Sequence, residues 1–176
     1  GEVLAETLPS ENSKIRNYPE KRLYAHIIGY NSAVYGKTLL EAKYNSELIG
    51  KSNLEFFQQI KKMLSEETPK GYDLRLTISH ALQVVAREQL GDRNGAVVAL
   101  DPNTGEILAM VSTPDFNPNA SKLEDNWKTL IESENSPLLP RATMGLYPPG
   151  SIFKVITAAA AIEAGKADYT TEDLGT

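Results

Sequence analysis

Residues 140–165, PRATMGLYPPGSIFKVITAAAAIEAG, decide the fold because they predict a buried helix with well-defined ends. Lys154 is the only charged residue between Ser151 and Ile162, and its neighbours are apolar on every side. A helix that is apolar all round is normally buried. The preceding YPPG disfavours a helix that starts earlier, because proline restricts its own backbone and that of its predecessor. We therefore expect the helix to begin at or near Ser151 and to end at Gly165.

Ser151 and Lys154 stand three residues apart, so on a helix their side chains share a face and can meet. Ser151 falls in the first turn, where free backbone N–H groups and the positive end of the helix dipole favour negative charge on oxygen. Apolar neighbours should partly desolvate the Lys154 amine, and desolvation favours its neutral form. A neutral amine can accept the serine proton, so the pair predicts a nucleophile and its general base.

A structural interpretation of the same two residues stays open. The spacing S-x-x-K occurs by chance about once in a chain of this length. Ser151 can be a helix N-cap, while Lys154 extends its amine to the surface along an apolar stem. The YPPG break before the serine, the apolar helix after it and the lack of another charge favour the catalytic interpretation.

The stretch RATMGLYPPGSIFK resembles the first active-site motif of the penicillin-binding proteins, which contains S-x-x-K. The resemblance extends upstream through GAVVALDPNTGEILAMVSTPDFNPN, YDLRLTISHALQ and RNYPEKRLYAHIIGYNS, so it covers nearly the whole chain. YPEKRLYAHIIGY and LIGKSNLEFF look like the membrane-proximal module of class B, the monofunctional transpeptidases. This resemblance implies an α+β fold: a pedestal module over residues 1–70, then the N-terminal part of a transpeptidase domain over 71–176, with an antiparallel sheet packed with helices.

The resemblance also implies the chemistry. Ser151 would attack the penultimate D-alanine carbonyl of a peptidoglycan stem peptide, with Lys154 as base, and pass the acyl group to an amine on a neighbouring strand. The Ser151 backbone N–H would supply half of the oxyanion hole. A β-lactam would acylate the same serine, and no metal or organic cofactor is implied. Other cell-wall synthesis proteins are expected partners.

GEVLAE, at the start of the chain, resembles the stretch that follows the membrane anchor in class B proteins. We therefore expect an anchor outside this chain that holds the protein at the extracytoplasmic face of a bacterial membrane. No serine follows Ser151, so the family's S-x-N motif is missing, and K-T-G or K-S-G is missing too. We expect these 176 residues alone to form little or no stable penicilloyl adduct. The exposed edge of an incomplete sheet would favour association.

Two other functions remain open from the sequence. A serine β-lactamase or β-lactam sensor would keep the fold and change the reaction. A non-catalytic scaffold of the wall-building complex would keep the fold as a binding surface. Replacing Ser151 by alanine separates the scaffold from the enzymes, because a scaffold should keep its cellular role.

Composition excludes several other classes of protein. The chain has 176 residues, of which 41% are hydrophobic, so it can bury a core. A net charge of -5 without a basic stripe argues against nucleic-acid binding. There is no cysteine, and neither His26 nor His80 is paired with a nearby carboxylate at ligand spacing, so we expect no metal site. No apolar run approaches the roughly 20 residues that span a bilayer.

Hydrophobic periodicity and turn residues predict the remaining elements. Trp127 either lines a cleft or anchors its own segment, and Arg141 is expected to hold the loop before the nucleophile. The predicted elements are a strand over 23–30, helices over 38–50 and 52–64, a domain boundary at 68–71, a strand over 72–78, a helix from N-cap Ser79 to Gly91, a hairpin of 95–100 with 106–112, and a long loop over 113–136 with a short helix at 127–131.

Overall fold

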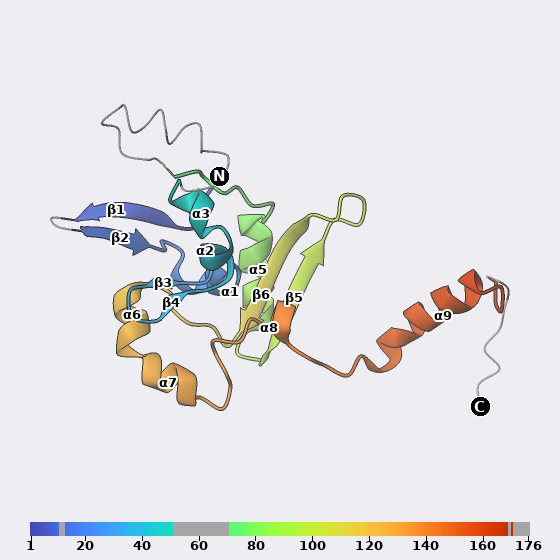
Figure 1. Ribbon diagram of the computed structural model, residues 1–176. Helices are drawn as coiled ribbons and strands as arrows, with labels where there is room; N and C mark the ends of the chain where they lie inside the picture. The colour runs from blue at the N-terminus through green and yellow to red at the C-terminus, as the bar shows by residue number, and fades with distance from the viewer. Residues whose placement is uncertain (11–12, 51–70, 169, 171–176) are drawn as a thin grey trace. The chain divides into compact units, whose positions relative to one another are not determined.

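The computed structural model describes residues 1–10, 13–50, 71–168 and 170 of the chain. By its internal contacts the chain divides into two units, Gly1–Gly145 and Leu146–Thr176. We call the first the larger unit and the second the C-terminal segment. The described residues contain helices and two-stranded antiparallel sheets, as Figure 1 shows, which confirms the predicted α+β class.

The first 50 residues of the larger unit form short elements around two hairpins. Strands β1 and β2 pair antiparallel with Leu8 opposite Ile15, and β3 pairs with β4. In chain order the elements are β1 Glu6–Ser10, β2 Ser13–Asn17, the 3-10 helix η1 Lys21–Tyr24, α1 Ala25–Ile28, β3 Asn31–Ser32, β4 Gly36–Lys37, α2 Leu39–Lys43 and α3 Asn45–Leu48.

The strand predicted over residues 23–30 is wrong, because this stretch forms η1 and α1. A turn starts the helix: the backbone N–H of Lys21 donates to the Tyr18 carbonyl at 3.1 Å. The apolar pairs Leu23–Tyr24 and Ile27–Ile28 then recur four residues apart, which puts them on one side of a helix. A short apolar run fits either structure by pattern alone, and here the local hydrogen bonds decide.

The helix predicted over residues 38–50 is present but broken. Tyr44 has φ −108° and ψ 22°, which separates α2 from α3. Gly50 ends the helical stretch with φ +71°, as expected. The helix predicted over 52–64 lies outside the described residues, and so do three of the four residues of the predicted boundary at 68–71.

Residues 71–145 of the larger unit contain a long helix, a hairpin and three shorter helices. Helix α5 packs on β6 (Figure 1). Ser79 is the N-cap of α5, as predicted, although its side chain makes no capping hydrogen bond, and Gly91 ends the helix with φ +58°. The elements are α5 His80–Leu90, β5 Gly95–Leu100, β6 Ile107–Thr113, α6 Ala120–Asp125, α7 Trp127–Glu132 and α8 Arg141–Met144.

The predicted hairpin is confirmed as the antiparallel pair β5–β6, with Val97 opposite Val111. Its turn closes where the Asp101 carboxylate accepts the backbone N–H of Asn103 at 2.8 Å. The strand predicted over residues 72–78 is wrong, because this stretch has no regular structure. The alternating pattern reflects side chains that are only partly covered. The stretch meets β6 where it ends, and there the backbone N–H of Ser79 donates to the Leu108 carbonyl at 2.8 Å.

The core of the larger unit joins the two parts of the chain that the sequence separated at residue 70. One buried cluster combines Ala25 and Tyr30 with Phe116 and Leu123. Trp127 stacks on Tyr35 with ring centroids 3.7 Å apart. Trp127 therefore anchors its own segment, and the loop predicted over 113–136 contains α6 in addition to the expected helix.

The C-terminal segment contains the 3-10 helix η3 Gly150–Phe153 and the helix α9 Lys154–Glu163. Among the described residues, no helix has the length and apolar character needed to cross a bilayer.

Candidate active site

The helical stretch that carries the predicted nucleophile begins where the sequence places it. Pro149 has φ −70° and ψ −22°, and Gly150 follows with φ +55°, a backbone conformation that favours glycine. The chain then enters η3 and continues as α9. The predicted start near Ser151 is thus confirmed to within one residue.

The predicted end at Gly165 is also confirmed, and its hydrogen bonds explain why. Gly165 has φ +63° and donates its backbone N–H to the Ile162 carbonyl at 3.0 Å. The N–H of Lys166 donates to the Ala161 carbonyl at 2.8 Å. These two bonds form a Schellman motif, which pairs carbonyls that a helix C-terminus otherwise leaves free.

Ser151 is the second residue of η3, and Lys154 is the first residue of α9. The two side chains are thus on consecutive helical turns, and both are exposed. The N-cap of η3 is Pro149 and that of α9 is Phe153, so the interpretation of Ser151 as an N-cap is wrong. In the first turn the backbone N–H of Ser151 has no acceptor within the helix and can donate to a ligand oxygen.

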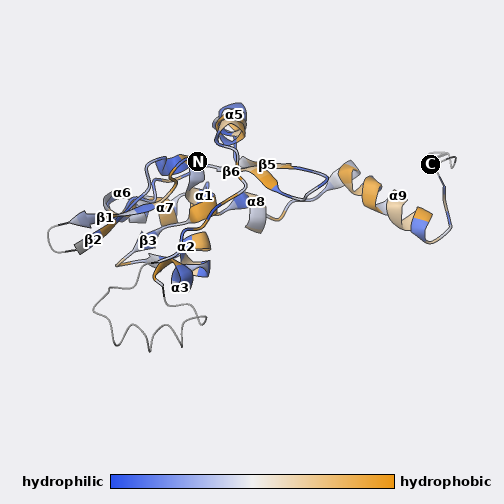
Figure 2. Ribbon diagram, turned by 90° about the horizontal axis from the view of Figure 1, so that it is seen from above, coloured by the Kyte–Doolittle hydropathy of each residue, from blue (hydrophilic) through white to orange (hydrophobic). Residues whose placement is uncertain are grey.

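The expected burial of this helix is not found. No residue of η3 or α9 is buried, and the exposed fraction is 80% for Ile152 and 73% for Val155. Figure 2 shows hydrophobic residues along α9. An apolar sequence creates the tendency to be buried, but burial needs a second surface, and the described part of this segment contains only η3 and α9. The expected desolvation of Lys154 is absent for the same reason.

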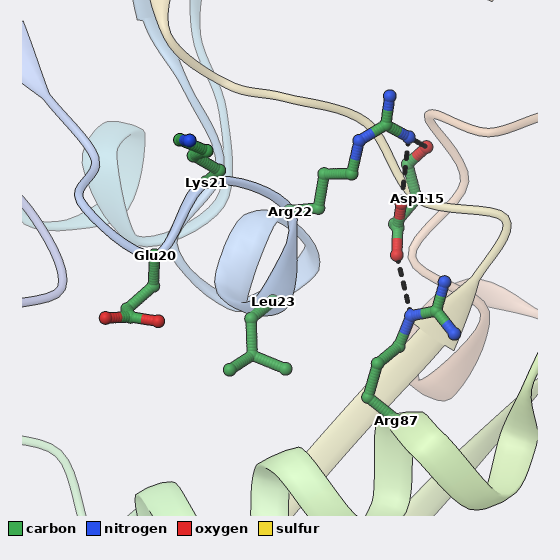
Figure 3. Close-up of a pocket in the computed structure, with 6 residues that line it drawn as sticks. All are labelled: Glu20, Lys21, Arg22, Leu23, Arg87 and Asp115. Carbon is green, nitrogen blue, oxygen red and sulfur yellow. Dashed lines mark hydrogen bonds and ion pairs between the residues drawn. The ribbon is translucent and has the colours of Figure 1, made fainter.

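A shallow pocket of about 370 Å³ lies in the larger unit (Figure 3). In it the buried Asp115 carboxylate lies between two guanidinium groups, with Arg22 at 3.2 Å and Arg87 at 2.8 Å. Both carboxylate oxygens are engaged in these ion pairs, so Asp115 is not poised as a nucleophile. Neither Ser151 nor Lys154 lines this pocket. It lies between the first 50 residues and α5. Its lining residues are Glu20, Lys21, Arg22, Leu23, Arg87 and Asp115.

The buried polar residues between the first 50 residues and α5 were not among the predicted site residues. Gln83 is fully buried, and its amide nitrogen donates to the Leu23 carbonyl at 3.0 Å and the Met110 carbonyl at 2.8 Å. Its amide oxygen accepts the Met110 N–H at 2.8 Å. One signal was available: Gln83 lies seven residues before the buried Leu90, which puts the two on one helix face. The neighbouring Leu82, although apolar, is exposed.

The histidines have structural contacts. His26 is buried, and its Nε2 lies 2.8 Å from the Pro137 carbonyl. Burial lowers the pKa of His26 below its usual value of 6.5. The Nδ1 of His80 hydrogen-bonds to the Tyr24 hydroxyl at 2.9 Å. Within the described residues no group of histidine, aspartate and glutamate side chains is arranged to hold a metal ion.

Arg141 has the structural role predicted from the sequence. It is buried at the start of α8, and its guanidinium donates to the backbone carbonyls of Ser136, at 3.1 Å, and Asn135. It therefore holds the loop that precedes the segment carrying Ser151.

Comparisons with known proteins match both parts of the chain. A family model described as the penicillin-binding protein transpeptidase domain matches residues 95–174. A second, described as the penicillin-binding protein A dimerisation domain, matches residues 1–74.

Relatives from bacteria match nearly the whole chain. The peptidoglycan D,D-transpeptidase MrdA of Acinetobacter baumannii is 37% identical over 92% of this chain and 28% of MrdA. The peptidoglycan D,D-transpeptidase PbpA of Mycolicibacterium smegmatis is 36% identical over 97% of this chain and 37% of PbpA. The chain thus spans about a third of the length of these relatives.

A solved structure gives the same result. Penicillin-binding protein A from M. tuberculosis, in its imipenem acyl-enzyme complex, matches with a TM-score of 0.84 at 35% identity, over 97% of this chain and 42% of that one. Two family models and these relatives agree, and the S-x-x-K pair lies within the matched transpeptidase domain. The chain therefore belongs to the penicillin-binding protein family.

Proposed function

We propose that the protein to which this chain belongs is a peptidoglycan D,D-transpeptidase, with Ser151 as nucleophile and Lys154 as general base. One observation carries the proposal: the two residues lie on consecutive turns at the start of a helix, within the matched transpeptidase domain. The relatives MrdA and PbpA are named as enzymes of this activity.

The reaction follows from the positions of these groups. Lys154 Nζ takes the hydroxyl proton as Ser151 Oγ attacks the carbonyl carbon between the last two D-alanines of a stem peptide. The backbone N–H of Ser151 donates to the oxyanion that forms. The amine of the terminal D-alanine takes the proton from Lys154 as the C–N bond breaks, which leaves a serine ester. An amine on a neighbouring peptidoglycan strand then attacks the ester carbonyl and forms the cross-link. The bond between this carbonyl and Ser151 Oγ breaks, and the proton lost by the amine passes to Ser151 Oγ through Lys154.

Lys154 can act as a base only if its amine is neutral at the pH of the reaction. The apolar side chains next to it are Ile152, Val155 and Ile156, and each is more than half exposed. Exposed apolar side chains favour burial against another surface, and such burial would support the role of Lys154. In the complete enzyme we expect a further part of the domain to cover them. That cover would remove water from around Lys154 and favour the neutral amine.

We also propose how the protein is organised and where it is located. Residues 1–70 form a membrane-proximal module, and residues 71–176 form the first part of the transpeptidase domain. An anchor outside this chain holds the protein at the extracytoplasmic face of the membrane, where peptidoglycan is the substrate. β-Lactams bind covalently to Ser151, and other cell-wall synthesis proteins are partners.

Labelling with fluorescent penicillin tests the proposal in the full-length protein. Ser151→Ala should abolish the covalent adduct, and Lys154→Ala should slow acylation by about a thousandfold or more, because the nucleophile loses its base. Ser121→Ala is the control, since Ser121 is an exposed serine in α6 of the larger unit. Stoichiometric labelling of the Ser151→Ala protein would contradict the proposal.

Two further measurements complete the test. Slow release of the penicilloyl group supports a transpeptidase, whereas rapid turnover indicates a β-lactamase. The 176-residue chain alone should form little or no stable adduct. Stoichiometric labelling of this chain would show that it contains a complete acylation site.

A further inference from the structure

The loop between α7 and α8 has an unusual backbone and unusual contacts. Ser136 lies in it with φ +44°, a conformation that side chains other than glycine rarely adopt. Such a conformation persists only where surrounding contacts hold it. The contacts that surround Ser136 therefore define how the loop is fixed.

Three successive carbonyls of this loop accept hydrogen bonds from two buried side chains. Arg141 donates to Asn135 and to Ser136. The next carbonyl, that of Pro137, lies 2.8 Å from His26 Nε2. A carbonyl can only accept, so Nε2 carries the hydrogen in this contact.

His26 comes from α1, in the first 50 residues, and lies 111 positions before Pro137 in the sequence. It is only 6% exposed, and its ring meets Phe116 edge to face at 5.4 Å between centroids. The imidazole is thus held by packing as well as by its hydrogen bond. Replacing it with an apolar residue would leave the buried Pro137 carbonyl without this donor, which is costly.

The loop leads directly into α8, and α8 leads to the C-terminal segment. Ser112 on β6 supports the same place, since its hydroxyl accepts the Ala142 N–H at 3.0 Å. At the end of α8 the Gly145 N–H donates to the Arg141 carbonyl at 3.1 Å. The point where the chain leaves the larger unit is therefore set by the contacts of this loop and this helix.

We propose that His26 is a positioning residue for acylation: by holding the Pro137 carbonyl, it fixes the loop and α8, from which the chain continues to Ser151. This inference rests on the proposed function, because it assigns His26 a role in the reaction of Ser151. His26 touches no reacting atom and acts through the backbone of residues 137–145.

Four variants of the full-length protein test the role. His26→Leu removes the donor, His26→Gln keeps an amide N–H near the position of Nε2, and His26→Asn has a shorter reach. Tyr24→Phe is the matched control, since it removes a hydrogen bond to His80 that also joins the first 50 residues to the rest of the larger unit but leads to α5. For each protein the acylation rate constant with fluorescent penicillin and the thermal midpoint are measured.

We expect His26→Leu to slow acylation by about tenfold or more, because a small displacement of a catalytic group has a large effect on rate. His26→Gln should stay within about threefold of the wild type, and His26→Asn should be slow. Tyr24→Phe should be acylated at the wild-type rate even if its thermal midpoint falls as far as that of His26→Leu. Equal rates for His26→Leu and Tyr24→Phe, or for His26→Gln and His26→Asn, would overturn the proposal.

Amide hydrogen exchange separates this inference from the proposed function. The N–H groups of Thr143, Met144 and Gly145 should exchange faster in His26→Leu, or in His26→Asn if the leucine variant does not fold, than in Tyr24→Phe. This readout needs no activity. If the wild type is not acylated, the proposed function fails while the exchange still tests the positioning by His26. Unchanged exchange in α8 would overturn the inference even where acylation of Ser151 is confirmed.

Discussion

The larger unit and the C-terminal segment differ in what holds their side chains. In the larger unit Leu123 and Gln83 are both fully buried. Gln83 hydrogen-bonds to Leu23 and Met110, which lie 60 and 27 positions away from it in the sequence. In the C-terminal segment α9 has local signals at both ends and no buried residue. An apolar sequence thus predicts that a helix forms, whereas its burial depends on what else is present.

The largest expected difference between the two regions is in the cost of removing an apolar side chain. Leu123→Ala should lower the free energy of unfolding of the 176-residue chain by about 3 kcal/mol, because it leaves a cavity in a packed core. Ile156→Ala should change it by less than about 0.5 kcal/mol, because that side chain is exposed. Chemical denaturation of both variants measures the difference.

The same pair of variants in the full-length protein sharpens the comparison. If a further part of the transpeptidase domain covers α9, Ile156→Ala should then cost nearly as much as Leu123→Ala. A negligible effect of Ile156→Ala in both proteins would show that α9 is not part of a core.

A smaller effect is expected for the buried amide of the larger unit. Gln83→Met keeps the length of the side chain but removes its hydrogen bonds to the Met110 N–H, the Met110 carbonyl and the Leu23 carbonyl. We expect a loss of about 2 kcal/mol in unfolding free energy, since unsatisfied buried polar groups are costly. Gln89→Met, at an exposed position of the same helix, is the control. Similar losses for the two variants would show that the hydrogen bonds of Gln83 contribute little.

A still smaller effect is expected at the end of α9. Gly165→Ala should weaken the Schellman motif by about 1 kcal/mol, because alanine disfavours a positive φ. A Cβ at this position would meet no atom within 4 Å, so the effect comes from the backbone alone. Amide exchange of Gly165 and Lys166 measures it, and unchanged rates would contradict the role given to the glycine.

The smallest expected effect is a pH dependence of the larger unit. Burial lowers the pKa of His26 below 6.5 in the folded protein, so the unfolded chain binds more protons as the pH falls below that value. Stability should therefore be full above pH 6.5 and decrease below it. Thermal midpoints between about pH 5 and 8 measure the slope, and His26→Gln should have a smaller one. Identical slopes would assign the pH dependence to other groups.

Local chemistry made part of the fold predictable. Ser79 and Gly91 mark the ends of α5, Pro149 and Gly165 mark the ends of the helical stretch from Gly150 to Glu163, and the turn residues after Leu100 mark the hairpin. The predictions failed where a short apolar run fits more than one structure. Residues 23–28 became helical, and residues 72–78 stayed irregular, because backbone hydrogen bonds and neighbouring elements decided between the alternatives.

The sequence predicted which two residues form the candidate site, but it did not predict how exposed they are. The positions of Ser151 and Lys154 follow from the backbone around YPPG, which the sequence encodes locally. The contacts of His26, Gln83 and Asp115 join segments far apart in the chain. No pattern of spacing in the sequence predicts which residues these side chains contact.

The sequence by itself determined where the apolar helix starts and ends and that serine and lysine lie one turn apart, because proline and glycine restrict the backbone of their own neighbours. Only the tertiary structure decided that the first 50 residues share a core with Phe116 and Leu123 and that His26 reaches the loop before α8. The reason is that a buried polar side chain needs a partner, and the fold alone brings that partner within hydrogen-bonding distance.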